Sequence, residues 1–140
     1  MGEARWYLPG HIIFAPGATG QKSVLVRNRE IFALMDTQGR PPKVHVLIDY
    51  RDMEPGDSNT GLEDVLGHLR DSSEYDRVIR DITQHPLIGW VVSIGSPSPR
   101  YRTAMNVLAL KDGVRRHEVS TLEEAIDFLK GKDPSLRDKI

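Results

Sequence analysis

The residues with the clearest chemical potential follow a strongly apolar run. Asp49 ends that run, Tyr50 and Arg51 come directly after it, and an Asp57-Ser58 pair precedes a helical pattern. An acid at the carboxyl end of a central strand stands where open α/β sheets place their ligands. Tyr50 and Arg51 would lie beside it and could bind the same ligand or partner. The structural alternative is that Asp49 ties down the loop that follows.

Ser58 has two interpretations. Four consecutive residues could each cap a helix that begins near Gly61, and these are Asp57, Ser58, Asn59 and Thr60. Alternatively, Ser58 accepts a phosphate, which would add about −1.5 to −2 charges at a helix N-terminus and would repel or recruit a partner. The sequence leaves both interpretations open.

A second candidate is the SPSPRYR segment that begins at Ser96. Ser98 suits an N-cap and Pro99 suits the first helical turn. The free amides of a helix start, with Arg100 and Arg102 in its first turn, predict an anion site. The alternative is a pair of solvated surface arginines.

The GATGQKS segment resembles a phosphate-binding loop only superficially. Gln21 separates Gly20 from Lys22, and no glycine stands at the earlier position that such a loop requires. A nucleoside triphosphatase is therefore not predicted. A helix N-terminus that binds a modest anion remains compatible with the sequence.

No residue is predicted to be catalytic or to bind a metal. The histidines stand at positions 11, 45, 68, 85 and 117, without the i, i+4 spacing of a helical metal site. No Ser-His-Asp set and no paired carboxylates emerge from the spacing. His45 lies within an apolar run and is expected to be buried and hydrogen-bonded. The sequence thus predicts a protein without enzymatic activity or cofactor.

The amino-acid composition excludes further classes of function. The chain has 140 residues, 19 basic and 20 acidic side chains, a net charge of −1 and no cysteine. Near-neutrality gives no case for nucleic acid, which usually requires a basic face. The absence of cysteine excludes disulfides and thiol catalysis. No apolar run approaches the ~20 residues of a membrane span, and no signal peptide is visible, so a cytoplasmic location is expected.

Apolar periodicity and breaker residues predict the element order ββαβααβαβα. The expected strands are 4–8, 11–15, 43–50, 88–95 and 114–119. The expected helices are 21–37, two between about 61 and 85, one from about 99 to 112, and one that follows a capping box at 120–123.

These elements predict an α/β fold, with a mixed, mostly parallel sheet of about five strands and helices packed on it. The valine-rich 43–50 run is typical of a central strand that is covered on both faces. The polar 114–119 run suits an edge strand. The chain is expected to form one domain, residues 1–130, with a flexible C-terminal tail at 131–140.

Three stretches resemble the STAS domain family, the fold of bacterial anti-sigma-factor antagonists. The first is the strand that ends at Asp49 with Asp57-Ser58 eight residues later. The second is VVSIGSPSPRYRTAMNVLAL, and the third is VRRHEVSTLEEAIDFL. Together they span roughly residues 43–130.

This resemblance implies a regulatory module in the bacterial cytoplasm that recognises a protein partner, such as a kinase or another regulatory protein. In the family, the serine of the Asp-Ser pair is phosphorylated, which here implies Ser58. A homodimer is also expected, since an edge strand or the Trp6-Tyr7 hairpin needs cover. The alternative is a small-ligand or lipid-binding domain of Sec14-like type, with an apolar cavity lined by Phe14, Phe32 and Met35.

Overall fold

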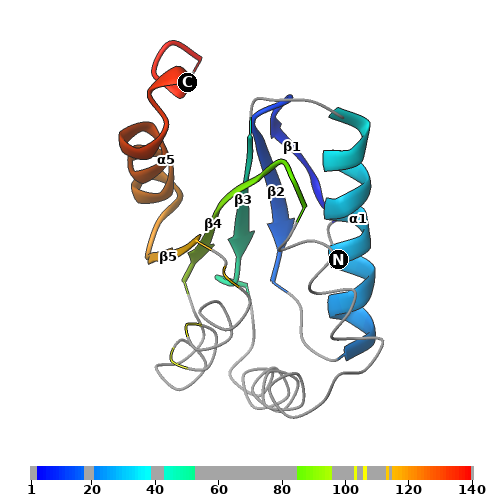
Figure 1. Ribbon diagram of the computed structural model, residues 1–140. Helices are drawn as coiled ribbons and strands as arrows, with labels where there is room; N and C mark the ends of the chain where they lie inside the picture. The colour runs from blue at the N-terminus through cyan, green and yellow to red at the C-terminus, as the bar shows by residue number, and fades with distance from the viewer. Residues whose placement is uncertain are drawn as a thin grey trace.

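One five-stranded sheet lies between two helices in the computed structural model (Figure 1). The structure describes residues 3–17, 21–38, 43–52, 85–95, 103, 106, 113 and 115–139. The strands are β1 (Arg5–Leu8), β2 (Ile12–Pro16), β3 (Val44–Asp49), β4 (Ile88–Ile94) and β5 (Arg115–Val119). The helices are α1 (Gln21–Gln38), α5 (Leu122–Lys132) and the short 3₁₀ helix η1 (Pro134–Leu136).

The strands lie in the sheet in the order in which they occur along the chain, from β1 to β5. β1 and β2 are antiparallel, and the three other neighbouring pairs are parallel. The turn between β1 and β2 uses Gly10 at φ +79°, a conformation that glycine adopts without steric cost. The predicted α/β class and the mixed, mostly parallel five-stranded sheet are confirmed.

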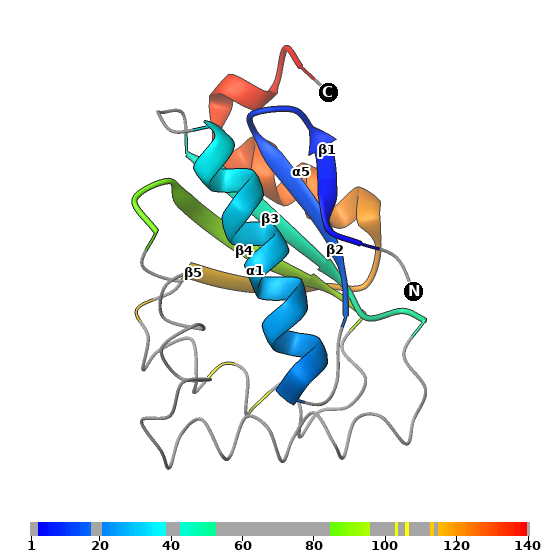
Figure 2. The same cartoon turned by 90° about the vertical axis from the view of Figure 1, so that its right-hand side faces the viewer.

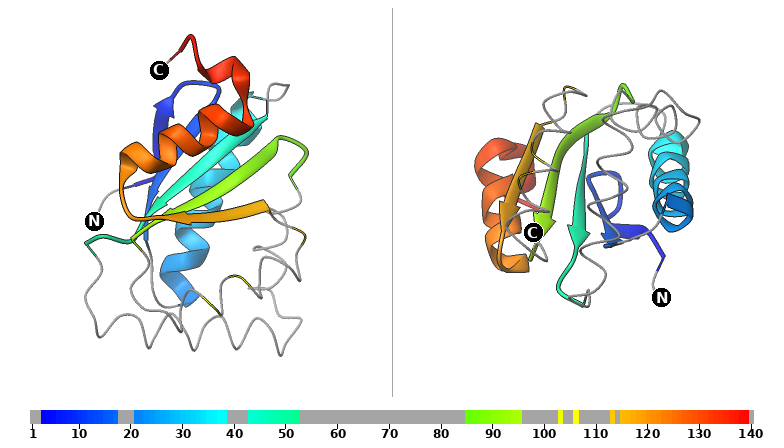
Figure 3. Two further views of the ribbon diagram at one scale, coloured as in Figure 1. Left: turned by 90° about the vertical axis from the view of Figure 1, so that its left-hand side faces the viewer. Right: turned by 90° about the horizontal axis from the view of Figure 1, so that it is seen from below.

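The sheet has two covered faces, and β3 is its central strand. Side chains alternate along a strand, so Val46 and Ile48 belong to the core beneath α1, whereas Leu47 belongs to the core beneath α5. Figure 2 shows α1 in front of the sheet, and Figure 3 shows α1 and α5 on opposite faces. A strand that is buried on both faces explains the near-continuous apolar run in the sequence.

The α5 face includes the C-terminal residues, contrary to the prediction of a tail at 131–140. α5 continues to Lys132, η1 follows, and the Leu136 side chain is fully buried. Leu136 packs in the same core as Leu129. The domain therefore includes at least residues 131–136.

The start of α5 differs from the predicted capping box by one residue. The N-cap is Thr121, whose Oγ1 accepts a hydrogen bond from the Glu124 backbone N–H at 3.1 Å. The Thr121 hydroxyl also donates to the Glu124 carboxylate at 3.2 Å. Thr121 rather than Ser120 therefore satisfies the first free amides of the helix.

Some predicted helices cannot be compared with the structure. The two expected between about 61 and 85 lie outside the described residues. The one expected from about 99 is described only at Thr103 and Asn106, and both are helical. The described part of the order, two strands, α1, β3, β4, β5 and α5, agrees with the prediction.

Strand order also bears on where a ligand could bind. In open α/β sheets, a ligand crevice forms where the strand order reverses. The four parallel strands here follow chain order without a reversal. Strand order alone therefore provides no crevice at the carboxyl edge, the end of the parallel strands that carries Asp49.

Candidate functional site

Asp49, the last residue of β3, is engaged by Arg51. The Arg51 Nε and Nη2 groups donate to the two carboxylate oxygens of Asp49, each at 2.9 Å. The Arg51 backbone N–H donates to Oδ1 at 3.0 Å. The side chain of Asp49 is 14% exposed and that of Arg51 is 44% exposed. Arg51 thus binds the carboxylate at the end of β3 through both its side chain and its backbone.

Asp49 and Arg51 each stabilise the charged form of the other. The hydrogen bond from the Arg51 side chain lowers the pKa of Asp49, although burial acts in the opposite direction. The same hydrogen bond raises the pKa of Arg51. Both groups stay charged near neutral pH, so Asp49 is not tuned to exchange a proton there.

Neighbouring glycines let the backbone pack closely at this carboxyl edge. The Gly17 N–H donates to the Asp49 carbonyl at 2.6 Å, and a Cβ on Gly17 would lie 2.5 Å from the Tyr50 ring. Gly95 has φ +68°, and a Cβ there would lie 2.8 Å from Cγ of Arg51. Tyr50 itself is buried, with its N–H donating to the Ile94 carbonyl at 2.9 Å.

This geometry favours the structural interpretation of Asp49, which ties down the chain after β3. Tyr50 belongs to the core beneath α1 rather than to an exposed loop surface. Arg51 is the most accessible group of the three. These contacts thus attach residues 49–51 to the carboxyl edge of the sheet.

The other predicted site residues cannot be placed. Those of the loop after β3 and those of the anion segment lie outside the described residues: Asp57, Ser58, Asn59, Thr60, Gly61, Ser96, Ser98, Arg100 and Arg102.

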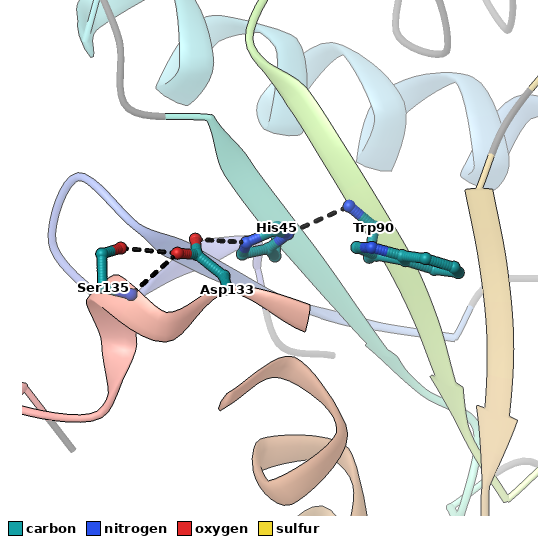
Figure 4. Close-up of polar contacts among 4 residues, drawn as sticks. All are labelled: His45, Trp90, Asp133 and Ser135. Carbon is teal, nitrogen blue, oxygen red and sulfur yellow. Dashed lines mark hydrogen bonds and ion pairs between the residues drawn. The ribbon is translucent and has the colours of Figure 1, made fainter. Parts of the chain in front are cut away.

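A second polar cluster surrounds His45 (Figure 4). The His45 Nδ1 accepts the Trp90 backbone N–H at 3.0 Å, so its Nε2 carries the proton and donates to Asp133 Oδ2 at 2.9 Å. The β3–β4 register shifts between Val44 and Val46, where the imidazole replaces a backbone acceptor. His45 is 4% exposed, which confirms the prediction of a buried, hydrogen-bonded histidine.

This cluster lacks the geometry of a nucleophilic triad. Ser135 donates its hydroxyl to Asp133 Oδ1 at 2.6 Å, and the Ser135 N–H donates to the same oxygen at 3.1 Å. The carboxylate thus lies between the serine and the histidine, so the imidazole is not positioned to remove the Ser135 proton. The contacts instead attach η1 to the central strand.

A third cluster joins β4, β5 and the helical residue Asn106. The buried Arg116 side chain donates to Asn106 at 2.6 Å, to the Ser93 hydroxyl at 2.9 Å and to Glu118 at 2.6 Å. Arg116 and Glu118 are two residues apart in β5 and therefore share one face of the sheet. Ser93 of β4 pairs with Glu118 in the strand register. Such a buried ion pair fixes the alignment of elements more reliably than it adds stability.

Sequence reasoning missed two buried polar residues on α1, Arg27 and Asn28. In the expected 21–37 helix, Val24, Ile31 and Met35 stand at the spacing of one apolar stripe. Helical spacing places positions 27 and 28 on that same stripe, so the polar pair interrupts it. This interruption was the available signal.

The residues proposed to line a lipid cavity do not converge. Phe14 packs against the core beneath α5, whereas Phe32 and Met35 belong to the core beneath α1. The sheet separates them, so the three side chains cannot line a single cavity.

Within the described ranges, no group of three or more His, Asp or Glu side chains could hold a metal ion. No described helix is long and apolar enough to cross a membrane. Comparisons with protein-family models, with curated proteins and with solved structures found no match.

Proposed function

We propose that this protein is a non-enzymatic, STAS-like regulatory module of the bacterial cytoplasm. It recognises a protein partner through the segment after β3, which includes Asp57–Gly61, and phosphorylation of Ser58 controls that recognition. The α/β class and the mixed five-stranded sheet are compatible with this proposal.

The observation that carries the proposal is the bidentate contact between Arg51 and Asp49 at the end of the central strand. Its hydrogen bonds use both carboxylate oxygens for structure, which suits an anchor better than a reacting group. Because Tyr50 is also buried, the chain leaves the sheet from a fixed point. A fixed base lowers the entropy that a binding segment loses when it meets its partner.

Phosphorylation would act through charge. A phosphate on Ser58 would add about two negative charges to the binding segment and would repel an acidic partner or attract a basic one. Two partners are part of this proposal. One is the protein kinase that phosphorylates Ser58, and the other is a regulatory protein that binds according to the state of Ser58. No nucleic acid is part of the proposal, given the net charge of −1.

Quantitative capture of partners tests this function. Wild-type protein and the variants Ser58→Ala and Ser58→Asp are immobilised and exposed to lysate of the source bacterium. The proposal expects at least one protein to bind Ser58→Asp and Ser58→Ala with clearly different yields. Ser120→Asp, a change at another exposed serine, is the control. Identical capture by both Ser58 variants would contradict the switch.

Homodimerisation through the N-terminal hairpin is the second part of the proposal. β1 forms one edge of the sheet, and the exposed fraction of its Tyr7 is 39%. At the other edge, β5 carries the buried charges of Arg116 and Glu118, which discourage the addition of another strand. We therefore expect a dimer at β1, and Tyr7→Lys should yield a monomer in light scattering. A monomeric wild type would contradict this part.

A further inference from the structure

The sheet-facing side of α1 contains an arginine without a counter-charge among the residues that the structure describes. Arg27 is 8% exposed, and its neighbour Asn28 is 6% exposed. The next residues of the same stripe, Ile31 and Met35, are apolar and belong to the core. Packing alone would favour another apolar residue at position 27.

Within the described part of the chain, the hydrogen bonds of the Arg27 side chain go to one neutral group. Its Nε and Nη2 both donate to the Asn28 side-chain oxygen at 3.2 Å. Its Nη1 is buried and has no hydrogen-bond partner in the described part of the chain. A guanidinium stays protonated at any physiological pH, so one amide oxygen faces a full positive charge.

Such an arrangement is costly for the isolated chain. Buried charges in proteins are normally paired, because removal of an ion from water is compensated only by an opposite charge and satisfied hydrogen bonds. A neutral amide oxygen compensates much less of this desolvation cost than a carboxylate does. A buried polar group without a partner calls for an explanation, and a bound ion is one such explanation.

The position of Arg27 adds to the positive potential. α1 follows β2 directly and runs back along the sheet, so its N-terminal half lies toward the carboxyl edge (Figure 1). Arg27 thus places a positive charge in the half of α1 that lies toward this edge. It is the seventh residue of the helix, beyond the first turn in which the helix dipole acts, so the guanidinium itself is the source of the charge.

We propose that Arg27 is the central cation of a site for one oxyanion, a phosphate or a carboxylate group, on the sheet-facing side of α1. The Asn28 oxygen orients the guanidinium through Nε and Nη2. The two N–H groups of Nη1 remain to bind the oxyanion. This proposal does not depend on the proposed function.

Thermal unfolding in phosphate tests the site, with sodium chloride added to keep the ionic strength constant. The midpoint of the wild-type protein should rise with the logarithm of the phosphate concentration, because a ligand that binds the folded state stabilises it by mass action. Arg27→Met should unfold at a higher temperature than wild type without phosphate, and it should lose the phosphate response. A parallel series in acetate distinguishes a carboxylate site from a phosphate site.

Arg29→Met is the matched control, since Arg29 lies on the exposed side of the same helix. It should keep the full response. Absence of any response of the wild type to both anions would overturn the proposal, as would an unchanged response of Arg27→Met. Arg27→Lys serves if the methionine variant does not fold. We expect the unfolding midpoint of Arg27→Lys to respond to phosphate several-fold more weakly than that of the wild type. An unchanged response would refute the site.

Discussion

His45 and Asp133 lie 88 positions apart in the chain, yet they share a 2.9 Å hydrogen bond that attaches the C-terminal turn to the central strand. The same imidazole accepts the Trp90 N–H from the neighbouring strand. One side chain thus joins β3, β4 and the segment after α5. The neutral, Nε2-protonated form is the only one that makes both contacts, because a proton on Nδ1 would oppose the Trp90 N–H.

The stability of the protein should therefore depend on the protonation of His45. Burial lowers the pKa of His45 below the ordinary histidine value of 6.5; the charges of Arg115 and His11 act in the same direction, and Asp133 opposes them. The unfolded chain then binds the proton more readily than the folded one, so the free energy of unfolding falls as the pH decreases through 6.5. Each pKa unit of difference contributes about 1.4 kcal/mol.

Urea unfolding at a series of pH values, over about pH 5 to 8, measures this dependence. His45→Gln should be less stable than wild type at neutral pH and should show a smaller pH slope. His117→Gln, a change at an exposed histidine, is the control variant. An undiminished slope in His45→Gln would show that another group is responsible.

The packed C-terminal turn leads to a second prediction. Leu136→Ala removes a fully buried side chain from the core beneath α5 and should lower the free energy of unfolding by about 2–5 kcal/mol. Lys139→Ala, an exposed change three residues later, should cost less than about 0.5 kcal/mol. Equal stabilities of the two variants in chemical unfolding would mean that the turn does not contribute to the core.

Replacement by alanine should change the free energy of unfolding in opposite directions at two glycines, Gly89 and Gly131. A Cβ on Gly89 would collide with His45 Nδ1, so Gly89→Ala should displace the imidazole, break its bond to Trp90 and cost about 1–3 kcal/mol. Gly131 lies within α5 with nothing within 4 Å of a new Cβ, so Gly131→Ala should add about 0.5–1 kcal/mol. Thermal unfolding compares them, and a stabilising Gly89→Ala would contradict the packing described around His45.

The sequence allowed accurate prediction where one physical effect dominated. The valine-rich run at 43–50 could be stable only as a doubly covered strand, and β3 is that strand. The polar 114–119 run could be accommodated at an edge, where β5 lies. For the candidate site, the role of Asp49 as a loop anchor was one of two interpretations, and its contact with Arg51 favours it.

Other features depend on contacts between distant parts of the chain. Leu136 is the only apolar residue of the segment PSLRDK, so no periodicity indicated that it enters the core. A local signal existed, because Asp133 before Pro134 is typical of a helical start, and Asp133 indeed accepts the Ser135 N–H. Its bond to His45 could not be inferred from spacing. The burial of Arg27 was missed as well, although its place on the apolar stripe of α1 was a signal in the sequence.

Ser58 is the residue on which the proposed function depends most. The purified protein is incubated with ATP and lysate of the organism from which it comes, and the stoichiometry of phosphate at each serine and threonine is measured by mass spectrometry, with Ser58→Ala as the control. The account predicts one dominant phosphate, on Ser58, that is absent from the control. Phosphate at other positions only, or none, would contradict the regulatory module proposed for this protein.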